Sequence, residues 1–216
     1  MLDLEREQVA RACRRLAAHG LVMGTSGNVS ARADDHVAIT PTGAVLAEVE
    51  ADQVTIIDME GRVVGGELEP TSESDMHLAV YGRYGAGAVV HTHAPVATAL
   101  SCVIDELPCI HYEMLLLGGP IRVADYATFG TPELAESAVE ALAGRTAAML
   151  ANHGTIAHGP DMDAAVQATG LLEWAADIYW RAAAVGKPRS LDANQRQAVI
   201  EAAVRRGYGS TRPADE

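Results

Sequence analysis

The sequence predicts an α/β protein in which helices cover a mostly antiparallel sheet. Two β-hairpin patterns follow one another in the first third of the chain, which indicates antiparallel strands. Segments with helical apolar spacing mix with the strand patterns, without the strict rhythm of βαβ units. No linker, repeat or low-complexity segment interrupts the pattern, so we expect a single domain over residues 1–216.

The charge balance limits the class of partner. The formal net charge is -13, and no cluster of Lys and Arg offers the basic face that nucleic acid or an anionic membrane requires. We therefore expect a small-molecule substrate and contacts with other copies of the chain. The first residues lack a signal-peptide pattern and no apolar run is long enough to span a bilayer, which predicts a cytoplasmic protein.

Two residue types exclude further chemistry. The cysteines Cys13, Cys102 and Cys109 are odd in number and widely spaced, so we expect reduced core thiols and no Cys-based zinc site. The only lysine, Lys187, lies in a polar break between two helical stretches, where no apolar pocket would lower an amine pKa. Schiff-base catalysis is therefore not expected.

The first half of the chain predicts one helix, two hairpins and a second helix. Asp3 should cap a helix that Gly20 ends, because the apolar residues between them follow helical spacing. Hydroxyls and acids before Met76 indicate another helix N-terminus near Glu73. The hairpin strands are expected at residues 28–32, 37–40, 54–57 and 62–64.

The second half predicts strands alternating with longer helices. Thr131 followed by Pro132 is a strong helix start. We expect loops at residues 107–113 and 126–130. Strands are expected up to His93 and at residues 121–123, 146–151 and 156–158, and helices at residues 95–100, 131–143, 162–184 and 192–205.

The histidines His91 and His93 form a candidate chelating pair. They end an apolar, β-branched run, and side chains two residues apart on a strand share a face. His153 ends another apolar run, and Glu73 supplies a carboxylate, which together make a site of the kind that zinc accepts. The alternative for Glu73 alone is to complement a helix dipole, and His77, one turn later, is interpreted as a core or supporting histidine.

Two turns rich in glycine and hydroxyls predict an anion site. The loop at residues 24–30 and the turn at residues 40–43 offer neutral donors, and the helix N-terminus near Glu73 adds amide hydrogens. Taken singly, each turn could equally be an ordinary connection. Together they could hold a phosphate while a metal polarises a sugar carbonyl, with Glu73 as general base and Tyr112 as the candidate acid. His111 is a possible neighbour of the site without an assigned task.

These residues resemble the metal-dependent class II aldolase and adducin head family, which includes L-fuculose-1-phosphate aldolase and L-ribulose-5-phosphate 4-epimerase. The resemblance covers nearly the whole chain and is nearest to the fuculose phosphate aldolases. Seven blocks in the right order carry it: Gly24-Thr25-Ser26-Gly27-Asn28-Val29-Ser30, Thr40-Pro41-Thr42-Gly43, Thr71-Ser72-Glu73, His91-Thr92-His93, Ile110-His111-Tyr112, Ala127-Thr128-Phe129-Gly130 and Asn152-His153-Gly154.

The resemblance implies roles for individual residues. Glu73, His91, His93 and His153 would bind one Zn²⁺ per subunit, and Glu73 would leave the metal to act as base. Tyr112, facing a site shared with a neighbouring subunit, and Tyr208 would assist proton transfer or close the site. The implied phosphate-binding residues are Thr25, Gly27, Asn28, Thr42, Gly43, Thr71 and Ser72, with Thr71 in place of the usual first serine of its block.

The resemblance also implies a three-layer α/β/α fold, a C4 homotetramer with shared active sites, and a reaction. A ketose 1-phosphate, such as L-fuculose 1-phosphate or a related deoxy- or pentulose 1-phosphate, would be cleaved reversibly to dihydroxyacetone phosphate and an aldehyde. Glu73 favours an aldolase over a 4-epimerase, which usually carries Asp there. Methylthioribulose-1-phosphate dehydratase, sugar-acid phosphate decarboxylase, a metallohydrolase and an adducin-like structural head are the alternatives.

Overall fold

The computed structural model describes residues 1–207, and the sheet is its central feature. Within these residues nine strands are hydrogen-bonded in the order β4-β3-β2-β1-β5-β9-β8-β7-β6. All neighbours are antiparallel except β7 and β8, so the sheet is mixed but mostly antiparallel, as predicted. The strands are β1 (Asn28–Ala33), β2 (His36–Ile39), β3 (Thr55–Asp58), β4 (Val63–Gly65), β5 (Ala88–Thr92), β6 (Glu106–Leu107), β7 (Ile121–Ala124), β8 (Ala147–Leu150) and β9 (Gly154–Gly159).

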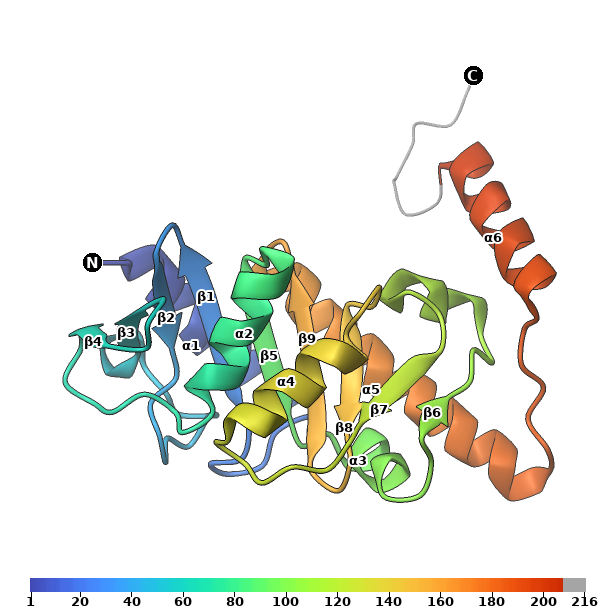
Figure 1. The fold of residues 1–216 in the computed structure, drawn as a ribbon, viewed down its shortest axis with the longest axis horizontal. Helices are drawn as coiled ribbons and strands as arrows, with labels where there is room; N and C mark the ends of the chain where they lie inside the picture. The colour runs from blue at the N-terminus through green and yellow to red at the C-terminus, as the bar shows by residue number, and fades with distance from the viewer. Residues whose placement is uncertain (208–216) are drawn as a thin grey trace.

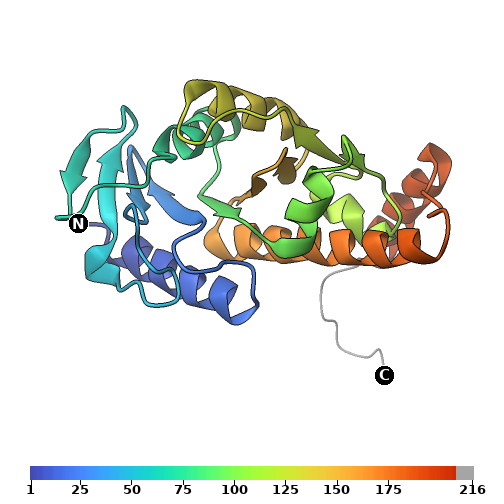
Figure 2. The same ribbon diagram turned by 90° about the horizontal axis from the view of Figure 1, so that it is seen from below.

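Helices cover both faces of the sheet. Figures 1 and 2 show α1 and α5 along one face and α2 and α4 along the other, which gives three α/β/α layers. The helices are α1 (Asp3–Ala18), α2 (Ser74–Tyr84), α3 (Pro95–Ser101), α4 (Pro132–Ala141), α5 (Met162–Val185) and α6 (Ala193–Arg206), with short 3-10 turns η1 (Ala51–Gln53) and η2 (Tyr112–Leu117). The fold class predicted from the sequence is therefore confirmed.

The central strand β5 divides the core. Ala88 and Val90 pack into the apolar cluster under α1 and the start of α5, whereas Val89 packs into the cluster under α2 and α4. Because side chains alternate along a strand, His91 lies on the same face as Val89. Strand β5 pairs with β1 and β9 in a register that places His91 opposite Asn28 and Ile156.

Three local predictions were wrong. Asp3 does not cap α1: the capping position is Leu2, in a left-handed conformation, and Asp3 is already in the first helical turn. The expected loop at residues 107–113 contains the end of β6 and the start of η2, elements too short for a periodic signal. Cys102 is exposed, although Cys13 and Cys109 are buried as expected and all three thiols are free.

The cap of α4 is as predicted, since the Thr131 hydroxyl accepts a hydrogen bond from the Leu134 amide at 3.4 Å. Among residues 1–207, no helix is both long enough and apolar enough to cross a lipid bilayer.

Candidate metal centre

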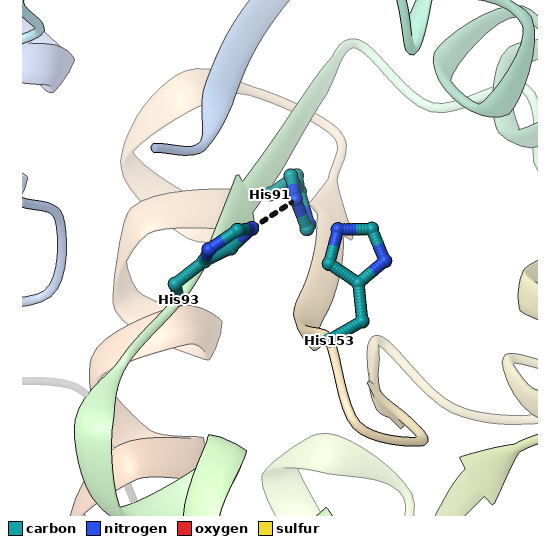
Figure 3. A group of neighbouring side chains, drawn as sticks. All are labelled: His91, His93 and His153. Atoms are coloured by element: carbon teal, nitrogen blue, oxygen red, sulfur yellow. Dashed lines mark hydrogen bonds between the residues drawn. The ribbon is translucent and has the colours of Figure 1, made fainter. Parts of the chain in front are cut away.

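Four predicted ligands come together from three parts of the fold. His91 lies in β5 and His93 directly after it, His153 lies in the turn between β8 and β9, and Glu73 is the capping residue of α2. Figure 3 shows the three imidazoles pointing toward one another. The side chains that the sequence separates by up to 80 positions therefore share one site.

Two glycines allow these segments to approach. Gly27 has φ +93°, and a Cβ there would lie 2.7 Å from the carbonyl oxygen of His91. A Cβ on Gly154 would collide with the Thr92 carbonyl and lie 3.0 Å from the His93 ring. The first loop and the β8–β9 turn can close on β5 only because both positions lack a side chain.

The spacing of the imidazoles suits a small divalent ion. The Nε2 atoms of His91 and His93 are 3.1 Å apart, and the three ring centroids are separated by 4.8 to 5.0 Å with near-perpendicular planes. Metal–nitrogen distances of about 2.1 Å in a tetrahedral site place two ligand nitrogens roughly 3.4 Å apart. The group therefore needs little movement to bind zinc or a similar ion.

The backbone fixes the tautomer of His91. Its Nδ1 lies 2.8 Å from the carbonyl oxygen of Thr155, which can only accept a hydrogen bond, so Nδ1 carries the proton. The Nε2 lone pair then faces His93 and Glu73. Histidines that bind metals are commonly oriented by such a bond from the second ring nitrogen.

The carboxylate of Glu73 faces the imidazoles. Its Oε2 accepts a hydrogen bond from Asn28 Nδ2 at 2.8 Å and lies 3.2 Å from His91 Nε2. Its Oε1 is buried and, among the described residues, accepts no hydrogen bond; His153 Nε2 is 3.4 Å away. A buried carboxylate oxygen without a hydrogen bond, beside three imidazoles, fits a divalent cation.

The charge states also fit a cation. Burial by itself raises the pKa of Glu73, but without a metal ion a protonated His91 Nε2, together with the Asn28 amide, holds this pKa well below its ordinary range. A cation at this position would replace that proton. Burial lowers the pKa of His93 to about 4 and also lowers the pKa of His153. The group therefore presents an anionic carboxylate, and the imidazoles of His93 and His153 keep their lone pairs at neutral pH.

A cleft of about 290 Å³ opens above this group. All seven residues predicted to bind phosphate line it: Thr25, Gly27, Asn28, Thr42, Gly43, Thr71 and Ser72. Glu73, His93 and His153 form its floor, while His91 is fully buried beneath them. Among the described residues, no Lys or Arg lines the cleft, so an anion would be bound by neutral donors.

Other predicted residues lie elsewhere. Tyr112 does not line the cleft; it is 40% exposed at the start of η2, beside His111, which packs edge-on against Trp174. Tyr208 lies outside the described residues. The roles assigned to both tyrosines therefore remain predictions.

Sequence reasoning gave no task to several residues of the cleft wall. Tyr126 and Phe129, each 66% exposed, lie on its rim, and Asn152 lines it with φ +54°. A sequence signal was available, because two aromatic residues three positions apart are unusual in a chain with only 4% aromatic residues. Ser26 and Pro41 complete the wall and carry no comparable signal.

A three-layer α/β/α fold with three histidines and one carboxylate beneath a neutral cleft defines a metal-dependent enzyme for a small polar substrate. Comparison with known families makes this specific. Residues 7–180 match the family model of the class II aldolase and adducin N-terminal domain. The chain therefore belongs to this family, and its relatives place it among the metal-dependent lyases.

The relatives cover nearly the whole chain. The 5-methylthioribulose-1-phosphate/5-deoxyribulose-1-phosphate aldolase of Rhodospirillum rubrum is 40% identical over 91% of this chain and 89% of its own length. The 5-deoxy-D-ribulose 1-phosphate aldolase of Bacillus thuringiensis is 36% identical over 97% of this chain and 99% of its own length. A solved structure of an L-fuculose 1-phosphate aldolase superposes with a TM-score of 0.87 and 35% identity, covering 91% and 94%.

Proposed function

We propose that the protein is a zinc-dependent aldolase that reversibly cleaves a ketose 1-phosphate into dihydroxyacetone phosphate and an aldehyde. The observation that carries this proposal is the carboxylate of Glu73 beside His91 and His153, on the floor of a neutral, hydroxyl-lined cleft. A divalent ion held there would act as a Lewis acid on the ketose carbonyl. Zinc suits the donor set best, since it accepts imidazole and carboxylate ligands in tetrahedral geometry.

The cleft walls divide the work of binding. Thr25, Thr42 and Ser72 line the cleft with exposed side chains, Ser72 lies two residues before the start of α2, and their hydroxyls would bind the phosphate. The sugar carbons would then lie between the phosphate and the histidines. Tyr126 and Phe129 on the rim would contact the far end of the sugar and exclude water.

Glu73 is the group placed to exchange a proton with carbon. In the condensation direction its carboxylate would take a proton from the carbon beside the carbonyl of dihydroxyacetone phosphate. That carbon then bonds to the aldehyde carbon, and the aldehyde oxygen takes up a proton from Tyr112. Tyr112 does not line its own cleft, so we infer that a neighbouring subunit supplies it within a C4 homotetramer.

The names of the relatives suggest the first substrates to test. Two of them are described as acting on 5-deoxyribulose 1-phosphate, and a structural neighbour on L-fuculose 1-phosphate. Both sugars are 1-phosphorylated ketoses that end in a methyl group, which the aromatic rim would accept. A cytoplasmic location remains our prediction from the sequence.

The zinc-loaded protein should release dihydroxyacetone phosphate from 5-deoxy-D-ribulose 1-phosphate, L-fuculose 1-phosphate or one of their stereoisomers. Coupled reduction of dihydroxyacetone phosphate measures the rate, and chelator-treated protein is the control. Loss of water from the sugar, epimerisation at C4, or loss of phosphate would each replace the aldolase assignment by one of the alternatives. No reaction with any of these sugars would overturn the proposal.

A further inference from the structure

A line of buried polar side chains runs from the metal centre into the core between α2 and the sheet. Ser30 of β1 and His77 and Tyr81 of α2 are each at most 1% exposed. None of them lines the cleft, and the proposed reaction gives none of them a task. Buried polar side chains are costly unless each is hydrogen-bonded, so their arrangement calls for an explanation.

Short hydrogen bonds join these side chains to Glu73. The Tyr81 hydroxyl is 2.7 Å from Ser30 Oγ, which is 2.7 Å from His77 Nδ1. On the other side of the ring, His77 Nε2 is 2.6 Å from Asn28 Oδ1. Asn28 Nδ2 is in turn 2.8 Å from Glu73 Oε2, so this series of hydrogen bonds ends on a predicted metal ligand.

The polarity of every bond is determined, starting from the carboxylate. Glu73 can only accept, so the Asn28 amide turns its NH₂ group toward Glu73 and its oxygen toward His77. That oxygen can only accept, so His77 Nε2 carries the proton. Burial lowers the pKa of His77 to about 3, which keeps the ring neutral and leaves Nδ1 as an acceptor for Ser30.

The same logic continues to the central strand. Because the Ser30 hydroxyl donates to His77, it must accept from Tyr81, and the Tyr81 hydroxyl accepts from the backbone amide of Val89. Val89 lies in β5, the strand that carries His91. Donors therefore run in one direction from β5, through α2 and β1, to the carboxylate that faces His91.

We propose that His77 is a positioning residue for the metal centre: it locks the Asn28 amide in the orientation that holds Glu73 toward the three histidines. The proposal rests on the proposed metal site. Without a donor at His77 Nε2, the Asn28 amide could rotate and present its oxygen to the carboxylate, which would repel Glu73. Among the described residues, Asn28 is the only side chain outside the imidazole group that donates a hydrogen bond to Glu73, and this bond would then be lost.

A purely structural role of these side chains would not require the series of hydrogen bonds. Apolar side chains of similar shape can replace a fully buried hydrogen-bonded set at little cost in stability, so the core alone does not demand His77. The link from His77 to a predicted metal ligand explains the series better, because removing a group that orients a metal ligand lowers metal affinity by about 10-fold to 100-fold.

The test compares His77→Leu with His77→Gln in the full-length apoprotein, titrated with Co²⁺. Leucine removes both ring nitrogens, whereas glutamine keeps a donor and an acceptor at the end of the side chain. We expect His77→Leu to weaken Co²⁺ binding about 10-fold to 100-fold and to alter the visible absorption bands of bound Co²⁺. His77→Gln should restore most of the affinity and the wild-type bands.

The outcomes separate this proposal from the metal site itself. Wild-type protein that binds no Co²⁺ would overturn the metal centre and the proposed function. Wild-type binding with unchanged affinity and spectrum in His77→Leu would overturn only the positioning role, as would a glutamine variant as weak as the leucine variant. If His77→Leu does not fold, Tyr81→Phe tests the positioning role instead. A few-fold loss of Co²⁺ affinity supports this role, and an unchanged affinity overturns it.

Discussion

The floor and the outer wall of the cleft are built in opposite ways. Glu73 on the floor is 7% exposed and accepts a hydrogen bond from Asn28, and His91 beneath it is fully buried and donates a hydrogen bond to the Thr155 carbonyl. On the outer wall, Thr25, Thr42 and Ser72 are exposed and lie on turns or at a helix start. The floor can therefore keep ligand positions fixed, whereas the wall can adjust to an incoming anion.

This difference separates two kinds of cost. Moving a floor residue disturbs the sheet and its hydrogen bonds, because His91 pairs with Asn28 across two strands. Changing a wall hydroxyl removes one donor and leaves the fold intact. We therefore expect floor substitutions to affect metal binding, chemistry and stability, and wall substitutions to affect substrate affinity alone.

The largest effect should come from Glu73→Gln. Glutamine has nearly the same shape and still accepts a hydrogen bond from Asn28, but it cannot take a proton from carbon. Exchange of the carbon-bound protons of dihydroxyacetone phosphate with solvent should slow by about two to four orders of magnitude, measured by NMR in D₂O. The exposed acid Asp75, changed to Asn, is the matched control and should exchange normally. Full exchange in Glu73→Gln would remove Glu73 from the role of base.

Removing one imidazole from the floor should have the next largest effect. Loss of a supporting group costs about 10-fold to 100-fold in metal affinity, so His93→Ala, which removes a predicted ligand, should cost on the order of 100-fold or more. Competition with a zinc chelator measures this loss. His19→Ala removes an exposed histidine at the end of α1 and should leave the affinity unchanged. Equal affinity in His93→Ala and wild type would contradict the metal site.

The first loop offers a test of how tightly the floor is packed. Gly27 and Gly24 both have positive φ, but only at Gly27 would a Cβ approach the backbone of His91. Gly27→Ala should lose about 3 kcal/mol of unfolding free energy, from backbone strain and overpacking together. Gly24→Ala, with strain alone, should lose about 1 kcal/mol. Urea denaturation compares them, and equal losses would show that the close approach to His91 carries no cost.

The sequence predicted the floor better than the wall of the cleft. The shared face of His91 and His93 follows from the alternation of a strand, and the position of Glu73 at a helix start follows from helix-start signals, since both depend on local patterns. The meeting of these segments with His153 depends on pairings between distant strands, which no local pattern encodes. The sequence grouped these residues because their side chains suit zinc, and the family resemblance implied the same set.

Local sequence patterns could not predict which side chains meet through tertiary contacts. Ser30 and Tyr81 look like ordinary strand and helix residues, and only the packing of α2 on β1 joins their hydroxyls to His77. The prediction that Asp3 caps α1 failed for a simpler reason. The helix begins at Asp3 itself, one residue earlier than the position of its best capping side chain predicts.

Acid should destabilise the folded protein through His77, which is buried in the core between α2 and the sheet. Burial lowers the pKa of His77 from 6.5 to about 3 in the folded protein. Between these two pH values, His77 is protonated in the unfolded protein but neutral in the folded protein. Stability is therefore lost as the pH falls through this window, by about 2 kcal/mol at pH 5 from this group. Urea unfolding at pH 7 and pH 5 measures the loss. His77→Gln should show a smaller loss, and an equal loss would assign the effect to other groups.

The smallest effect should come from a single wall hydroxyl. Ser72 is exposed in the cleft, directly before Glu73, and its hydroxyl would donate to the substrate phosphate. A hydrogen bond to a charged group contributes about 1.5 kcal/mol or more, so Ser72→Ala should raise KM roughly 10-fold while kcat and zinc affinity stay unchanged. The unphosphorylated sugar at high concentration is the control, because its turnover should not depend on Ser72. A fall in kcat or zinc affinity would mean that Ser72 belongs to the rigid floor, and the boundary between the two parts of the cleft would have to be moved outward.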